Sequence, residues 1–210
     1  MTNAKYEFVE GDEKEIAPGV VLKRIRALVA ISATIFSPAV APGDLGGYIQ
    51  QESNLEVSGN AWVYGNARVS GDARAYGNAQ VYGDAWVYGN ARVSGDARVY
   101  GNARVYGNAW VYGNAQVSGN AQVHGDAWVY GDGLIFWASK VGTENGTLTV
   151  YNAKNKDLLV TRGCFFGTPA EFLAKSAEEH DERTHREYSL LIEVATSRIE
   201  AARAELGEKS

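Results

Sequence analysis

Glycine returns at every sixth position through the middle of the chain. It stands, without a break, at positions 59, 65, 71, 77, 83, 89, 95, 101, 107, 113, 119, 125 and 131. From position 59 to position 125, each glycine is followed by Asn or Asp and then by Ala. Collagen needs glycine at every third residue, and a helix does not space glycine so regularly. The spacing therefore indicates one short structural unit repeated along the chain.

Each six-residue unit, such as "GNARVY", has the pattern of a short strand and a corner. Ala and Val stand two residues apart, so both side chains lie on one face of a strand, and the residues between and after them lie on the other. Gly followed by Asn or Asp suits a corner, because these residues adopt left-handed backbone angles at the least cost. The pattern predicts an all-β solenoid with a small apolar interior and polar or aromatic side chains outside.

Residues 47–136 resemble the hexapeptide-repeat family in this six-residue pattern. The resemblance implies a left-handed parallel β-helix of triangular cross-section, with three units in each coil. Twelve full units and their fainter flanks then make about five coils, on the order of 24 Å long at ~4.8 Å per coil. The chain departs from the family directly after the aliphatic residue, where it has Tyr, Ser or His in place of the usual Gly, Ala, Glu or Asp.

Three units per coil place residues eighteen apart in outward columns. We predict that one column binds a ligand or partner through Arg74, Tyr76, Arg92, Trp110, Tyr112, Trp128 and Tyr130. Exposed aromatic and guanidinium planes stack on bases or sugars, and arginine forks phosphates. The other two columns run from Trp62 through Arg98 and from Arg68 through Arg104. The alternative for any of these rings is that it stabilises its own sheet or lies under a cap or another subunit.

The two ends of the solenoid must be capped, because open ends expose unpaired strand edges. We assign residues 1–46 to an N-terminal β cap, 47–136 to the solenoid, 137–167 to a β-strand extension and 168–210 to C-terminal helices. In the extension, "GTLTVYNA" and "DLLVTRGCFF" are expected to form two strands. "TPAE" from Thr168 is a capping-box pattern that opens a helix to about Glu179. A second helix is expected from Glu182 to Leu206, ending at Gly207.

The second predicted helix carries an apolar stripe with alternating spacings of four and three. The stripe consists of Tyr188, Ile192, Ala195, Ile199, Ala202 and Leu206. Such a stripe either packs on the prism of the solenoid or pairs with copies of itself in an oligomer. Because the solenoid faces offer interfaces as well, we expect a homo-oligomer, either a trimer or a dimer.

A narrower resemblance extends over nearly the whole chain. The segments "LKRIRAL", "GDLGGYI", "GNAWVYGNARVSGDA" and "VTRGCFFGTPAEF" are similar to hexapeptide-repeat proteins encoded by bacteriophages and prophages, which are often labelled transferases. That label is inherited from the fold. The resemblance implies a phage-type protein that acts in the host cytoplasm.

Residues suited to catalysis or metal binding are few. Hexapeptide-repeat acyltransferases commonly use a histidine as general base, and His124 is the one histidine of the repeat, where sister positions have Tyr or Ser. His180 and His185 are expected at a solvated helix junction. Cys164 is expected to be a buried small residue among apolar neighbours. We predict no metal, no cofactor and no catalytic residue, with His124 as the weak candidate.

Charge and hydropathy exclude other classes of protein. The formal net charge is −5, and the repeat from 59 to 131 has five arginines against four aspartates, so strong nucleic-acid binding is not expected. The longest apolar run, residues 27–36, is about half the ~20 residues of a spanning helix, and the charged first residues do not form a signal peptide. We expect a non-enzymatic cytoplasmic binding or scaffold protein, one that sequesters a small nucleotide signal or inhibits a host defence protein. An acyltransferase and a virion or assembly component are the alternatives.

Overall fold

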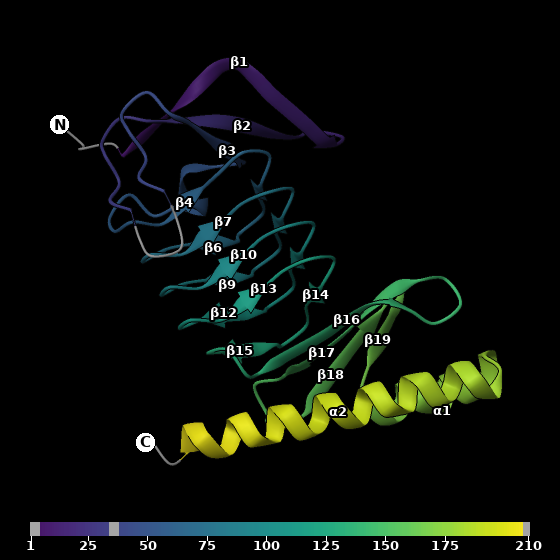
Figure 1. Ribbon diagram of the computed structural model, residues 1–210. Helices are drawn as coiled ribbons and strands as arrows, with labels where there is room; N and C mark the ends of the chain where they lie inside the picture. Colours follow the sequence, from purple (N-terminus) through teal and green to yellow (C-terminus); the bar gives the residue numbers. More distant parts are fainter. Residues whose placement is uncertain (1–4, 34–37, 208–210) are drawn as a thin grey trace.

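The computed structural model describes residues 5–33 and 38–207, and three parts follow one another along it (Figure 1). The N-terminal part contains β1 (Tyr6–Ala17), β2 (Val20–Ala27), β3 (Leu45–Ile49) and the 3₁₀ turn η1 (Glu52–Asn54). The C-terminal part contains β16 (Ile135–Val141), β17 (Gly146–Asn152), β18 (Leu158–Arg162), β19 (Phe165–Gly167), α1 (Pro169–Glu179) and α2 (Glu182–Gly207). Between them lies a stack of short strands of about five turns.

The stack is built from three parallel sheets, as the glycine spacing predicts. One sheet contains β4 (Trp62–Val63), β7 (Gln80–Val81), β10 (Arg98–Val99) and β13 (Gln116–Val117). The second contains β5 (Arg68–Val69), β8 (Trp86–Val87), β11 (Arg104–Val105) and β14 (Gln122–Val123), and the third contains β6 (Arg74–Ala75), β9 (Arg92–Val93), β12 (Trp110–Tyr112) and β15 (Trp128–Tyr130). Within each sheet, a strand pairs with the strand eighteen residues further on, for example Arg74 with Arg92. The predicted columns are therefore confirmed.

The first turn is longer than the others. Tyr48 pairs with Arg68 and Leu55 bridges to Ala75, which are offsets of twenty residues and not eighteen. Trp62 pairs with Gln80 at an offset of eighteen, so the two extra residues lie between Leu55 and Trp62, just after η1. The regular six-residue spacing therefore begins only after residue 58.

Alanine and valine fill the interior of the stack. The side chains at these positions, such as Ala91, Val93 and Val111, are completely buried. Small and branched residues alternate through the repeat, so the three sheets pack closely around a narrow apolar interior. At ~25 cal/mol per Å² of buried apolar surface, this interior is the main favourable term for the stack.

Glycine and asparagine build the corners for two separate reasons. Gly101 has a φ of +69°, and a Cβ added to it would lie 3.0 Å from the backbone nitrogen of Gly119 in the next turn. The Asn and Asp side chains that follow the glycines form ladders between turns; Asn102 Nδ2, for example, donates to Asn120 Oδ1 over 3.1 Å. The corner therefore needs both a left-handed backbone and a short amide or carboxylate side chain.

The N-terminal part caps the first turn. β1 and β2 pair antiparallel, β2 pairs with β3, and β3 joins the sheet of β5, so the cap continues one face of the stack. The Nζ atom of Lys5 donates to the carbonyl oxygens of Glu56 and Ala61. Desolvation by burial lowers the pKa of Lys5 to about 8. The predicted border between residues 46 and 47 lies within β3, because this strand belongs to both parts.

The C-terminal sheet caps the last turn through its side chains. Thr161 Oγ1 donates to the carbonyl of Gln122, and Thr149 Oγ1 accepts from the backbone N–H of the same residue. The hydroxyl of Tyr151 bonds the backbone N–H and carbonyl of His124 in the same manner. These contacts pair backbone groups at β14, the last strand of its sheet, that a further coil would otherwise pair.

The C-terminal extension has four antiparallel strands in the order β16-β17-β18-β19, where the sequence predicts two. β16 begins at Ile135, just before the predicted border at residue 137. The segment "DLLVTRGCFF" bends at Gly163, whose φ is +57°, and so forms both β18 and β19. The predicted capping box of α1 is confirmed, since Thr168 accepts from the backbone N–H of Glu171 and Glu171 accepts from that of Thr168.

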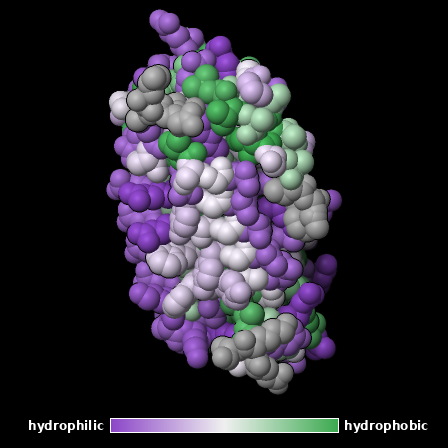
Figure 2. All heavy atoms as spheres, turned by 90° about the vertical axis from the view of Figure 1, so that its left-hand side faces the viewer, coloured by the Kyte–Doolittle hydropathy of each residue, from purple (hydrophilic) through white to green (hydrophobic). Residues whose placement is uncertain are grey.

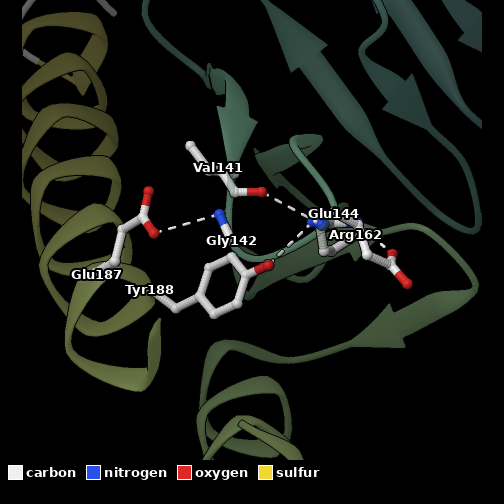
Figure 3. A network of polar contacts seen from close by, with 6 residues as sticks. All are labelled: Val141, Gly142, Glu144, Arg162, Glu187 and Tyr188. Carbon is white, nitrogen blue, oxygen red and sulfur yellow. Dashed lines mark hydrogen bonds and ion pairs between the residues drawn. The ribbon is translucent and has the colours of Figure 1, made fainter. Parts of the chain in front are cut away.

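The apolar stripe of α2 packs against the chain's own C-terminal sheet. Tyr188, Ile192, Ala195 and Ile199 are buried, while Ala202 and Leu206 are half-buried. Figure 3 shows how polar contacts hold the helix in place: Glu187 accepts from the N–H of Gly142, and the Tyr188 hydroxyl accepts from Arg162 Nε. Arg162 also donates to the carbonyl of Val141 and pairs with Glu144.

This packing corrects the expectation that the stripe mediates assembly. The two alternatives were packing on the prism of the solenoid and pairing between copies, whereas α2 packs on β16 and β17 of the C-terminal sheet. The four buried side chains do not reach the surface, so a partner copy cannot contact them while α2 keeps its place. A homo-oligomer would have to use other surfaces.

Candidate ligand-binding face

The sheet of β6, β9, β12 and β15 carries the predicted binding residues on its outward side. Parallel pairing places Arg74 beside Arg92, Arg92 beside Trp110, and Trp110 beside Trp128. We call this surface the Arg–Trp face and define it by Arg74, Arg92, Trp110 and Trp128 with the neighbouring Tyr76, Ser94, Tyr112 and Tyr130. All seven predicted residues therefore lie on one face of the stack.

The side chains of the Arg–Trp face contact one another along the column. The guanidinium carbon of Arg92 lies 4.9 Å from the centroid of the Trp110 ring. The rings of Trp110 and Trp128 meet edge to face, with centroids 6.3 Å apart and planes at 73°. Tyr112 and Tyr130 lie beside each other with centroids 4.9 Å apart. Two cations thus precede two indoles along the same line.

Much of the Arg–Trp face is exposed to solvent. Trp110 and Tyr130 are each 41% exposed, and Arg74 and Arg92 are exposed as well. Burial raises the pKa of Tyr112, which keeps its hydroxyl protonated and neutral near pH 7. Figure 2 views the repeat from the left-hand side of Figure 1 and shows a pale band of intermediate hydropathy between purple, hydrophilic margins. Glycine, serine and aromatic residues of the repeat have this intermediate hydropathy.

Two cavities open on the Arg–Trp face. One, of about 320 Å³, is lined by Asn108, Trp110, Asp126, Ala127, Trp128 and Lys154. The other, of about 400 Å³, is lined by Glu52, Ser53, Leu55, Glu56, Val57, Arg74, Ala75, Tyr76 and Arg92. We call them the indole cavity and the arginine cavity. Arg92 links them, because it lines the arginine cavity and packs on Trp110 of the indole cavity.

Four residues of the indole cavity are absent from the predicted set, namely Asn108, Asp126, Ala127 and Lys154. Asn108 and Asp126 are corner residues, which the sequence pattern assigns to the ladder: Asn108 Nδ2 donates to Asp126 Oδ1 over 3.1 Å. Lys154 lies in the turn after β17, and its backbone N–H donates to the carbonyl of Asp126. The corner spacing places Asn108 and Asp126 beside the tryptophans. No pattern in the sequence brings Lys154 there, since it depends on how the C-terminal sheet docks.

The other two faces are more covered than their sequence predicts. Trp62 is completely buried, because Tyr6 of β1 packs on it with ring centroids 6.4 Å apart. On the face of β5, β8, β11 and β14, the rings of Tyr88, Tyr106, His124 and Phe166 stack in sequence, with centroids 4.6, 4.5 and 4.0 Å apart. For these residues the structure favours the alternative in which aromatic rings stabilise the sheets and caps.

The stack defines the environment of His124. Its ring lies between Tyr106 of the preceding turn and Phe166 of β19. Burial lowers the pKa of His124, so the neutral imidazole is favoured between these rings. This position gives His124 a packing role that links the solenoid to the C-terminal sheet. It lies on a different face from the indole cavity.

The remaining histidines and the cysteine lie in the C-terminal part. Cys164 is exposed, so the expectation that it is buried is wrong; it sits beside Gly163 in the turn between β18 and β19. It lines a cavity of about 500 Å³ together with His180 and Tyr188. The Nδ1 atom of His185 lies 3.3 Å from Ser176 Oγ. Among residues 5–33 and 38–207, no group of three or more His, Cys, Asp or Glu side chains could hold a metal ion.

Comparison with known proteins concerns the repeat. A family model described as the YdcK Beta solenoid repeat matches residues 61–77, 79–95, 85–99, 97–113 and 115–131. The family match and the three parallel sheets indicate the same fold for the repeat. The repeat segment is a β-solenoid. Four of the five matched segments begin eighteen residues apart, at positions 61, 79, 97 and 115, and together the segments span the solenoid from β4 to β15, which includes the whole Arg–Trp face.

Two further findings concern the whole sequence and the helices. No curated protein matches the sequence. None of the helices in the described part of the chain is both long and apolar enough to cross a membrane.

Proposed function

We propose that the protein is a non-enzymatic binding protein whose β-solenoid presents the Arg–Trp face to a small nucleotide. The observation that supports this most directly is the order of side chains along one column, in which two exposed guanidiniums lead into two indoles. Indole planes stack on bases and guanidinium groups bind phosphates. The solenoid holds these groups at fixed spacing, because the backbone of each turn is hydrogen-bonded to the next.

The biological setting of the proposal comes from the resemblance to phage-encoded proteins. We propose that a phage-type protein of this kind acts in the cytoplasm of the host, where it sequesters a nucleotide signal. A rigid face with preordered side chains suits sequestration, since little conformational entropy is lost on binding. Direct inhibition of a host defence protein is the other outcome that a binding experiment can reveal. Assembly into a trimer or dimer is part of the proposal and can be measured by light scattering.

A thermal-shift screen tests the proposed function. The purified chain is heated with a panel of mononucleotides, cyclic nucleotides and dinucleotides, and each stabilising compound is then measured by calorimetry. A ligand at one hundred times its Kd raises the stability by about 2.7 kcal/mol, which is a readily measured shift. We expect at least one nucleotide to stabilise the protein, and we expect Arg92→Gln to reduce that effect. A panel without any stabilising nucleotide would overturn the proposal.

A further inference from the structure

We propose that the indole cavity holds the base of a nucleoside phosphate and that Arg92 and Arg74 hold its phosphate. This inference rests on the proposed function and specifies where each part of the nucleotide lies. It is carried by the shape and charge of the two cavities on the Arg–Trp face.

The walls of the indole cavity suit a planar ring. Trp110 and Trp128 are at 73° to each other, so a ring that stacks on one indole meets the edge of the other. Aromatic pairs prefer both of these arrangements, offset stacked and edge to face. The cavity volume of about 320 Å³ is of the size that small-molecule sites have.

The remaining lining of the indole cavity offers both hydrogen-bond donors and acceptors. Lys154 supplies an ammonium group, Asp126 a carboxylate and Asn108 an amide. A base presents donors and acceptors on its edge, and a ribose presents hydroxyl groups that do both. A purely apolar ligand would cover the charges of Lys154 and Asp126 without pairing them, which is costly. The lining therefore favours a polar ring compound over a hydrophobic one.

The phosphate is assigned from the position of the two arginines. Arg92 and Arg74 precede Trp110 by one and two turns, which is ~5 and ~10 Å along the solenoid axis. Arg92 is held against the Trp110 ring, so its guanidinium is ordered before the ligand arrives. An ordered guanidinium binds phosphate oxygens in a bidentate manner. A single molecule with a base at the indoles can reach this cation with its phosphate.

Acidic residues of the arginine cavity limit the affinity for an anion. Glu56 and Glu52 line this cavity with the two arginines. The Oε2 atom of Glu56 accepts from the backbone N–H of Gly77, which holds the carboxylate near the cavity. Glu56→Gln keeps an oxygen acceptor for Gly77 and removes the negative charge. The variant should therefore fold normally and bind a nucleoside phosphate more tightly than the natural protein.

Calorimetric titration of the full chain with AMP, GMP, adenosine, guanosine and inorganic phosphate tests the assignment. At least one mononucleotide should bind more tightly than its nucleoside. Trp128→Ala should weaken binding of that nucleotide and of its nucleoside about tenfold or more, because base stacking is lost. Arg92→Gln should weaken only the nucleotide, and Glu56→Gln should strengthen only the nucleotide. Arg104→Gln, an exposed arginine at the same repeat position of another sheet, is the matched control and should change neither.

The possible outcomes distinguish a failure of this inference from a failure of the proposed function. If a nucleotide binds the natural protein but Trp128→Ala, Arg92→Gln and Glu56→Gln leave its affinity unchanged, the assignment to the two cavities is overturned and the proposed function stands. If Trp128→Ala does not fold, Lys154→Ala replaces it, because that exposed turn residue lines the same cavity. If only cyclic nucleotides or dinucleotides from the wider screen bind, the assignment to a mononucleotide is overturned and the proposed function stands. If no nucleotide of any class binds, both proposals fall.

Discussion

The guanidinium of Arg92 packs on the ring of Trp110, which lies one turn further along the same sheet. The contact is a cation–π pair on an exposed surface, where such pairs contribute about 0.5–1 kcal/mol. A double-mutant cycle with Arg92→Ala and Trp110→Ala, measured by urea unfolding, should give a coupling free energy of about that size. The same cycle on Arg104 and Gln122, which are paired in the next sheet without an aromatic ring, should give a coupling near zero. Equal couplings for the two pairs would contradict the cation–π explanation.

Replacement of corner glycines should separate backbone strain from steric contact between turns. Gly65 has a φ of +57° with nothing within 4 Å of an added Cβ, whereas Gly101 has a φ of +69° with Gly119 N at 3.0 Å. Gly65→Ala should therefore cost about 1–2 kcal/mol for the left-handed backbone alone. Gly101→Ala should cost more than that, because the neighbouring turn must also shift. Equal free energies of unfolding for the two variants would show that the stacking contact is not a constraint.

His124 should make stability depend on pH below neutrality. Burial lowers its pKa in the folded chain, whereas the unfolded chain keeps the ordinary value of about 6.5. Below that pH the unfolded chain binds the proton more readily, so the free energy of unfolding falls as the solution becomes more acidic. In the His124→Tyr variant a phenol ring, like those of Tyr88 and Tyr106, replaces the titrating imidazole at this position of the stack. The variant should lose less stability than the natural protein between pH 7 and pH 5, and parallel pH profiles would contradict the assignment.

Local patterns predict the solenoid well, because each turn is specified by residues close in sequence. The spacing of Ala91 and Val93 is enough to place both inside, and Thr168 and Glu171 are enough to begin α1. Contacts between distant segments are not predictable in this way. Trp62 has the same pattern as Trp110, yet it is buried, because β1 returns to cover it. Lys154 and Phe166 reach the solenoid only through the docking of the C-terminal sheet.

The same distinction applies to the candidate site. The eighteen-residue column identifies Arg74, Arg92, Trp110 and Trp128 as neighbours, and the pairing of the strands confirms it. The sequence does not tell which of three similar columns stays exposed, because that depends on what the two caps cover. It also does not show that Asn108 and Asp126 serve both the corner ladder and the lining of a cavity.

Lys5 should make stability rise with pH in the alkaline range. Burial lowers its pKa to about 8 in the folded chain, below the ordinary 10.5, even though the nearby Glu56 carboxylate favours the charged form. Between these two values the unfolded chain carries the proton and the folded chain has released it, so the free energy of unfolding increases with pH. From pH 8.5 to pH 10 the increase should be about 2 kcal/mol, since a full pH unit inside this window corresponds to about 1.4 kcal/mol.

Lys5→Met is the variant that isolates this effect. It removes the titrating amine and keeps an unbranched side chain of similar length between the first turn and the cap. Tyr6, whose pKa is raised to about 12 by burial, titrates in both proteins and cancels in the comparison. Chemical unfolding at pH 7.5, 8.5, 9.3 and 10 should therefore show the natural protein gaining stability relative to Lys5→Met across the series. A constant difference between the two proteins would mean that the Lys5 amine keeps its proton in the folded chain, and that it caps the carbonyls of Glu56 and Ala61 as an ordinary charged lysine.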